Sequence, residues 1–194
     1  MKTYLIVFLL IISINCFGQD TLQVYNFARN RIKNTGMQVL GSWASANIIV
    51  GGIGWASTNG TTKYFHQMNT IWNVANLGIA IMGYVNTLND KDRRYTAQKS
   101  LQEQNKIEKI FLINGGLDLV YIGTGLYLTH RGNVNHSDQL SGYGSAVLLQ
   151  GAFLLLFDAV MYTSEKRAGN KLRHFLLKNP LIFDGNKIGM VINF

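Results

Sequence analysis

Four long apolar stretches, nearly free of charged residues, recur along the chain and are separated by polar or charged segments. Each has about the ~20 residues that cross the hydrocarbon core of a bilayer. Lipid offers no partners to backbone polar groups, so each stretch should form a helix. The pattern therefore predicts an all-α membrane protein with four transmembrane helices, over residues 37–55, 69–88, 110–129 and 143–162.

The segment before these stretches has the pattern of a signal peptide over residues 1–18. Lys2 precedes an apolar run at 4–14 that is short for a span, and Cys16-Phe17-Gly18 offers a usable cleavage site. The alternative is an uncleaved first anchor. Lipid attachment at Cys16 is less favoured, because residues 13–15 match a lipoprotein motif poorly.

Segments on either side of the spans mix apolar and charged positions. Residues 20–34 and 165–178 are typical of amphipathic helices on a membrane surface, and the charged loop 90–109 should also be helical. After Pro180, residues 181–183 and 187–194 flank Asp184-Gly185, which predicts a short β-hairpin. The expected organisation is a signal peptide, a transmembrane domain over 19–162 and a basic interfacial tail over 163–194.

The first and third spans resemble each other. Residues 47–54 align with residues 118–125, with a polar residue in the middle of each span and two glycines after it. This indicates two tandem helical hairpins in the same orientation, although glycine is common in membrane helices and chance is the alternative. The matched pairs are Asn47 with Asp118, Gly52 with Gly123, Gly54 with Gly125, Thr58 with Thr129 and, less closely, Gln67 with Gln139.

Composition supports a membrane class and leaves sidedness open. Only 14% of residues are charged, against about 25% in soluble domains. The net charge of +8 forms no compact basic and aromatic patch, which argues against nucleic-acid binding. Most Lys and Arg lie in the N-terminal segment, the second loop and the tail. A cleaved signal peptide places those segments outside, whereas the positive-inside rule places them in the cytoplasm.

Polar residues inside the spans recur at helical spacing, so they should face inward and contact one another. The first span is expected to present Gln38, Ser42 and Ser45 on such a face. The expected intramembrane polar cluster comprises His66, Asn69, Asn73, Asn76, Asn47, Asn114, Asp118, Gln150 and Asp158.

Asp118 and Asp158 carry the most information, because a charge at mid-membrane costs about 3 kcal/mol. They should lie at similar depth. They form either a structural polar lock or part of a proton or cation path, and the small number of ionisable groups favours the lock. His130 and His136 lack the spacing of a helical zinc motif. No catalytic motif is present, so we expect no cofactor, no metal site and no enzymatic activity.

Two runs, residues 64–78 (YFHQMNTIWNVANLG) and 142–158 (GYGSAVLLQGAFLLLFD), resemble an uncharacterised domain-of-unknown-function family of small membrane proteins from Bacteroidota. The resemblance covers nearly the whole mature chain. It implies a four-helix membrane protein and brings no activity or functional residues with it.

These observations predict a multi-pass protein of the bacterial inner membrane, with a non-catalytic structural or partner-binding role in the envelope. Its expected partners are the lipid bilayer and either a second copy or another membrane protein. The alternative is a small oligomeric transporter or channel that uses Asp118 and Asp158. An intramembrane enzyme is the least favoured class.

Overall fold

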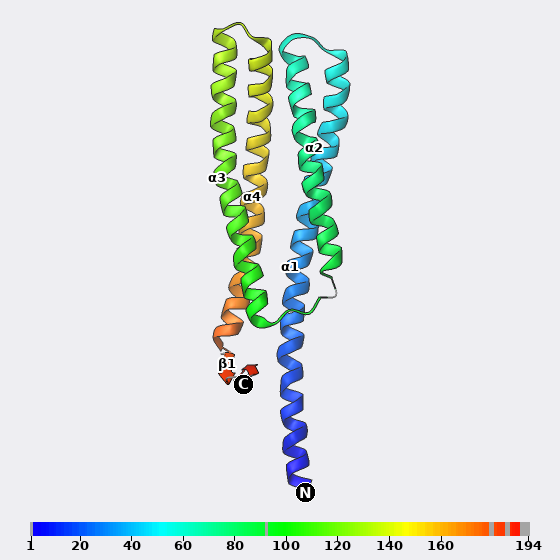
Figure 1. Ribbon diagram of the computed structural model, residues 1–194, viewed down its shortest axis with the longest axis vertical. Coiled ribbons are helices and arrows are strands. Elements are labelled where there is room, and N and C mark those ends of the chain that lie inside the picture. The colour runs from blue at the N-terminus through cyan, green and yellow to red at the C-terminus, as the bar shows by residue number, and fades with distance from the viewer. Residues whose placement is uncertain (1, 92, 179–180, 185–186, 191–194) are drawn as a thin grey trace.

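The structure is a computed structural model that describes the backbone of residues 2–91, 93–178, 181–184 and 187–190, and side chains over 21–91 and 93–178. Long helices dominate it (Figure 1). The elements are α1 (Lys2–Ser57), α2 (Gly60–Asn89), α3 (Ala97–Val134), α4 (Asp138–Lys178), β1 (Leu181–Asp184) and β2 (Lys187–Met190).

The four helices form two hairpins that stand side by side. α1 packs on α2, α3 packs on α4, and both hairpin turns lie at the upper end in Figure 1. The hairpins meet mainly through α2 and α4, with a smaller contact between α1 and α4. The expected pair of tandem hairpins in the same orientation agrees with this arrangement.

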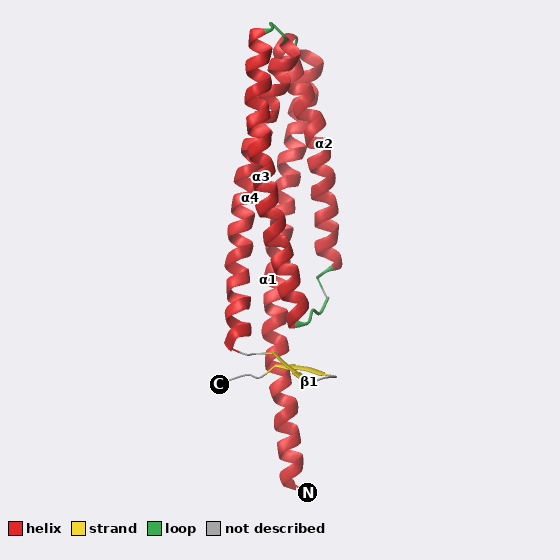
Figure 2. Ribbon diagram, turned by 60° about the vertical axis from the view of Figure 1, so that its left-hand side comes forward, coloured by secondary structure: helices red, strands yellow, loops and turns green. Residues whose placement is uncertain are grey.

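The flanking helices differ from the prediction. Residues 20–34 continue α1 and residues 165–178 continue α4, so neither segment turns to lie on a surface (Figure 2). Leu22, Ala97 and Leu172 form a small apolar core where α1, α3 and α4 meet at the lower end. The apolar positions of the flanking segments therefore pack on one another, and the predicted boundary at residue 162 falls inside a continuous helix.

Two short strands follow the helices. β1 and β2 pair antiparallel, with Leu181 opposite Met190 and Asp184 opposite Lys187. They fall in the region where the sequence predicts a β-hairpin, but residues 185–186 and 191–194 lie outside the described residues. The predicted signal peptide also lies outside the residues whose side chains are described.

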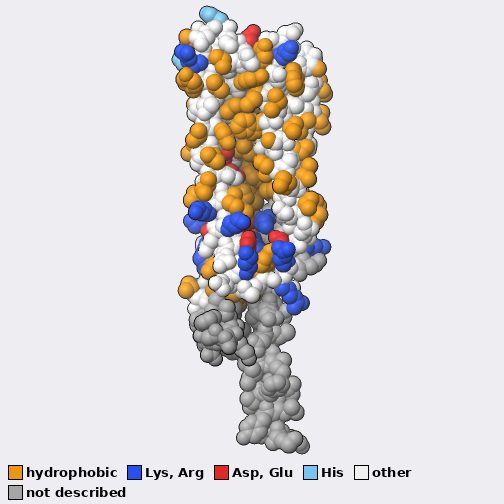
Figure 3. Space-filling view, viewed as in Figure 1, with side chains coloured by type: hydrophobic (Ala, Val, Ile, Leu, Met, Phe, Trp, Pro, Cys, Tyr) orange, Lys and Arg blue, Asp and Glu red, His pale blue; other side chains and the backbone are white. Residues whose placement is uncertain are grey.

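The outer surface of the bundle is strongly apolar. Hydrophobic side chains cover its middle and upper parts, and Lys and Arg gather at the lower end (Figure 3). Within the described residues, three helical segments are long and apolar enough to cross a membrane: Thr21–Ser57, Ala97–Val134 and Asp138–Lys178. α2 is not among them. Its inner face carries buried Asn69, Asn73 and Asn76.

Matched glycines of α1 and α3 have matched environments. A Cβ on Gly52 or Gly123 would meet nothing within 4 Å. A Cβ on Gly54 would collide with the His66 ring of α2, and one on Gly125 would collide with the backbone of α4. In each hairpin the second glycine therefore faces the partner helix and the first faces away.

The matched threonines also make the same bond. Thr58 Oγ1 donates to the Gly54 carbonyl at 2.7 Å, and Thr129 Oγ1 donates to the Gly125 carbonyl at 2.9 Å. The duplication does not extend to Gln67 and Gln139 as predicted, because Gln67 lies well inside α2 whereas Gln139 lies in the first turn of α4. The second helices of the two hairpins start at different offsets.

We expect Gly125→Ala to destabilise the protein by about 1–3 kcal/mol, the usual cost of overpacking a close contact. Its Cβ would lie 2.6 Å from Leu148 N and 2.8 Å from the Gly144 carbonyl oxygen, and backbone atoms cannot move aside cheaply. Gly123→Ala, two residues earlier on the open face, is the matched control. Equal unfolding midpoints for both variants in detergent micelles would contradict the close α3–α4 contact.

Candidate functional site

A buried network of amide side chains joins three helices in the middle of the bundle. Asn69 Nδ2 on α2 donates to Asn47 Oδ1 on α1 at 2.8 Å. Gln150 Nε2 on α4 donates to Asn69 Oδ1, and Trp43 Nε1 on α1 donates to Gln150 Oε1 at 3.1 Å. Asn69 is 3% exposed and Gln150 is fully buried. The Asn69 amide thus has a partner on each of two other helices.

The sequence places these residues through helical periodicity. Asn69, Asn73 and Asn76 are spaced by three and four residues and all lie on the buried face of α2, as expected. Asn73 Nδ2 donates to the Asn69 carbonyl at 2.8 Å, which holds it along the same helix. The role of Trp43 was not predicted. Its only signal in the sequence is its position one turn before Asn47, whose Nδ2 donates to the Trp43 carbonyl at 2.8 Å.

The expected polar face of the first span is wrong in part. Gln38 and Ser42 are exposed, and Gln38 donates to Asn34 of its own helix. Leu40 and Ala44 are buried instead, so the inward stripe of α1 is mostly small or apolar. Small and weakly polar residues on both sides of this helix give only a weak periodic pattern of hydrophobic and polar positions. The sequence therefore predicted the wrong face of α1 as the buried one.

Asp118 and Asp158 are brought together, on α3 and α4. Their carboxyl groups lie next to each other, and the two residues are 3% and 5% exposed. Asp118 Oδ2 is buried and has no hydrogen-bond partner among the described residues. Two carboxyl groups this close repel each other when both are ionised, so the pair disfavours carrying two negative charges at once.

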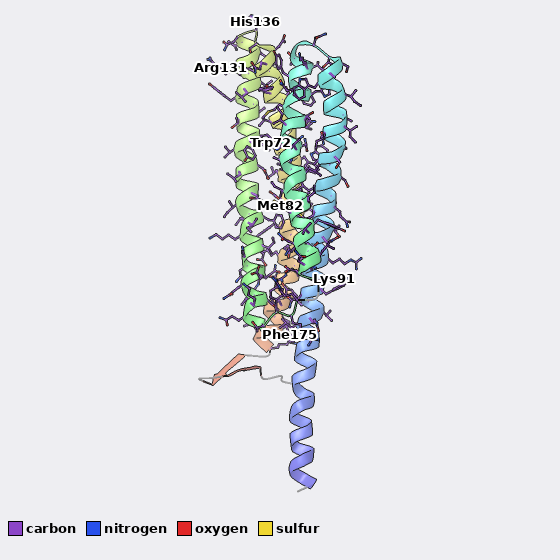
Figure 4. The ribbon with its side chains drawn as sticks, turned by 45° about the vertical axis from the view of Figure 1, so that its right-hand side comes forward. Trp72, Met82, Lys91, Arg131, His136 and Phe175 are labelled. Carbon is purple, nitrogen blue, oxygen red and sulfur yellow. The ribbon has the colours of Figure 1, made fainter. Side chains whose placement is uncertain are left out.

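The aspartate pair lies at the base of a groove of about 570 Å³ between α2 and α3. Figure 3 shows this hollow on the front of the bundle, with acidic side chains visible among hydrophobic ones. Asn76 and Asn114 also line it, and Asn76 Nδ2 is buried without a partner among the described residues. Trp72, labelled in Figure 4, packs edge to face on Tyr121 with ring centroids 4.9 Å apart.

The predicted cluster therefore divides into two groups and one outlier. Asn47, Asn69, Asn73 and Gln150 belong to the amide network, whereas Asn76, Asn114 and the aspartate pair line the groove. His66 belongs to neither. Its ring packs against Gly54 near the upper turn, and its Nδ1 has no partner among the described residues.

A second polar cluster at the lower end was not predicted. Gln104 is fully buried and accepts a hydrogen bond from the Tyr25 hydroxyl. Its Nε2 donates to Glu108 Oε1 at 2.8 Å and to the Glu165 carbonyl at 2.7 Å. Burial raises the pKa of Tyr25, so this hydroxyl keeps its proton and can donate. Gln104 thus joins α1, α3 and α4.

Arg29 also lies inside this lower cluster. It is 4% exposed, donates to the Ser100 carbonyl at 3.2 Å and sits 5.3 Å from the Tyr95 ring centroid. Asn26 Nδ2 donates to Ser100 Oγ at 2.9 Å beside it. The sequence indicated surface residues here, because an amphipathic segment with arginines is typical of a membrane interface. The packing of three extended helices buries them instead.

Glu165 on α4 is the most confined acid of the lower cluster. It is fully buried, and both protons of the nearby Gln104 amide already have other acceptors. Burial raises the pKa of its carboxyl from 4.5 to about 7, although Arg29 and Lys33 act in the opposite direction. Glu165 therefore titrates near neutral pH.

Within the described side chains, no group of three His, Cys, Asp or Glu residues is arranged to hold a metal ion. His130 and His136 are both exposed at the upper end of the hairpin α3–α4, where Figure 4 labels His136. They lie far along the bundle from the aspartate pair and the amide network.

Comparison with known proteins identifies a family and no activity. The model of a family of unknown function, DUF6992, matches residues 39–159. The chain belongs to this family. The match covers the amide network and the aspartate pair, and it ends before the lower cluster of α4. No curated protein matches the chain, and no solved structure matches it.

The raised pKa of Glu165 predicts a specific dependence of stability on pH. Between about pH 4.5 and 7 the folded chain holds more protons than the unfolded chain, so stability falls as pH rises through this window. Glu165→Gln should remove that fall, which is on the order of 2–3 kcal/mol. Chemical unfolding in micelles at pH 5 and pH 8 measures it.

Glu103→Gln is the matched control. The pKa of Glu103 is lowered by its hydrogen bond with Lys99, so this residue contributes stability that is lost only as the solution becomes more acid. The Glu103 variant should keep the decline of the parent protein between pH 5 and 8. An unchanged decline in Glu165→Gln would show that Glu165 is ionised throughout the range.

Proposed function

We propose that this chain is a non-catalytic, multi-pass membrane protein with a structural or partner-binding role in the bacterial envelope. Its inward polar faces hold one bundle geometry and its apolar exterior faces lipid. The observation that carries the proposal is the amide network around Asn69, which links α1, α2 and α4 through buried hydrogen bonds.

The exterior supports the membrane part of the proposal. A soluble protein rarely exposes a continuous apolar surface larger than a few hundred Å². Here large hydrophobic residues are exposed on all four helices, among them Ile53, Met82, Val120 and Leu156, each more than 60% exposed. Such a surface is stable in lipid. All four helices would cross the bilayer, and α2 would also be held by its amide contacts with α1 and α4.

The distribution of charged residues supports a defined position of the bundle in the membrane. Lys and Arg gather at the lower end of the bundle (Figure 3), whereas Lys63 near the start of α2 and Arg131 in the last turn of α3 lie toward the upper turns. The apolar band between these ends would occupy the membrane. The proposal includes entry through an N-terminal signal peptide, residence in the inner membrane, and assembly with a second copy or another membrane protein.

The buried network supports a structural role over a chemical one. The side-chain amides of Asn69 and Gln150 each donate to another helix of the bundle, so these groups act between helices. In lipid an unmade bond has no water to replace it, so such a network favours one register of the helices.

The aspartate pair favours one alternative function, a small oligomeric transporter or channel for protons or cations. Asp118 and Asp158 are in contact and lie at the base of a groove rather than in the packed centre. Ionisable groups inside membranes often mark ion pathways.

Flux measurements on the full chain in liposomes separate the two functions. The structural role predicts no flux of protons, sodium or chloride above that of protein-free liposomes. It also predicts that Asp118→Ala lowers the free energy of unfolding by about 1–3 kcal/mol, because Asp158 loses its buried partner. Gln102→Ala, at an exposed position of the same helix as Asp118, is the control and should change stability less. Flux that Asp118→Ala abolishes would establish the transport alternative instead.

A further inference from the structure

The groove between α2 and α3 has walls from both hairpins. α2 contributes Ile71, Trp72 and Ala75, and α3 contributes Phe111, Leu117 and Tyr121. α1 and α4 form its back through Leu40 and Phe157, among others. Its volume of about 570 Å³ lies in the range of small-molecule sites. Because α2 and α3 barely touch, the groove opens sideways, toward the lipid of the proposed membrane.

The polar groups of this groove are concentrated at its base. Asp118 and Asp158 lie next to each other there, and Asp118 Oδ2 has no hydrogen-bond partner among the described residues although Asp118 is only 3% exposed. Asn76, 5% exposed, brings an unpartnered Nδ2 from the opposite wall. An unpaired buried polar group is costly, so these atoms are suited to a ligand.

The ionisable residues at the bottom of the groove determine whether a ligand there should be positively or negatively charged. The lining residues include two aspartates and no Lys, Arg or His. A negative charge on either aspartate therefore has no counter-ion among the residues that line the groove. A buried charge is strongly destabilising unless it is paired. The groove is therefore complementary to a ligand that carries a positive charge.

The residues of the groove walls determine which kind of cation fits and which substituents it should carry. An inorganic cation such as Ca²⁺ requires about six to eight oxygen ligands, and this groove is mainly apolar. Trp72, Phe111, Tyr121 and Phe157 bring four aromatic rings to it. Aromatic faces attract organic ammonium groups, particularly where water is excluded. The remaining apolar wall fits hydrocarbon or aryl substituents.

We propose that the α2–α3 groove binds a lipophilic organic cation, with its positive charge at the Asp118–Asp158 pair and its apolar substituents against the aromatic walls. The ligand enters sideways from the bilayer. The proposal rests on the membrane location of the bundle and does not require transport, so it is separable from the flux test above.

Equilibrium binding to the purified full chain in micelles tests this assignment. The probes are tetraphenylphosphonium and triphenylphosphine oxide, which share aryl groups but differ in charge. The parent protein should bind the cation at least tenfold more tightly than the neutral probe. Asp118→Asn with Asp158→Asn keeps the side-chain shapes and removes the charge, so it should lose at least tenfold in cation affinity while neutral-probe binding stays unchanged.

A second pair of variants tests the location without touching the aspartates. Ala75→Trp fills the groove from α2 and should abolish binding of both probes. Val74→Trp places the same side chain on the adjacent outward position, which is 59% exposed, and should leave binding intact. This pair decides the outcome even if the double aspartate variant does not fold.

Three results would overturn the proposal: no binding of the cation to the parent protein, equal affinity for both probes, or cation binding that survives Ala75→Trp. Equal affinity would indicate a site for neutral amphiphiles. Survival of binding in Ala75→Trp would place the cation elsewhere on the apolar surface.

Discussion

The side chain of Asn69 makes hydrogen bonds in two directions, toward Asn47 on α1 and Gln150 on α4. In a surrounding of apolar side chains, each of these bonds is expensive to leave unmade. Only one rotation of α2 about its axis, and one height against its neighbours, satisfies both. The position of the first hairpin on the second follows from that requirement. α3 takes no part in the network, and the groove opens on its side of the bundle.

Two further features fix how the helices are aligned at the ends of the bundle: close backbone contacts near the upper turns and a second polar cluster at the lower end. Near the upper turns, Gly142 of α4 lies so close to the α2 backbone that a Cβ would collide with it, 2.7 Å from Phe65 N. At the lower end, Gln104 links three helices, and Arg173 pairs with Glu108 at 3.0 Å. Phe175, labelled in Figure 4, marks this end of α4. Hydrophobic burial alone is non-directional and would not select one register among helices with apolar exteriors.

Local periodicity explains what the sequence could predict. The three- and four-residue spacing of Asn69, Asn73 and Asn76 predicts one buried face, and long apolar runs predict helices. Matching glycines predict the paired hairpins. The contacts of Gln104 and Arg29 depend on three extended helices meeting outside the apolar band. No local pattern reports that meeting, so an amphipathic segment was interpreted as an interfacial helix.

The misassigned face of α1 has a similar cause. Gln38 and Ser42 are polar but exposed, whereas Trp43 contributes its indole N–H to the buried network. Hydropathy classes tryptophan with apolar residues, so its donor is invisible to a pattern of hydrophobic and polar positions. The sequence could predict that Asp118 and Asp158 lie close together, because the lengths of the spans place both residues at a similar depth. The groove beside them was not, because it arises from the separation of α2 and α3.

A double-mutant cycle between Asn69 and Gln150 tests the central claim most directly. Asn69→Ala, Gln150→Ala and the double variant would be compared with the parent chain by reversible unfolding in lipid bicelles. If this bond fixes the hairpins, the two single effects should not add, and the coupling free energy should be about 0.6–2 kcal/mol. Additive effects, with a coupling energy near zero, would contradict the account.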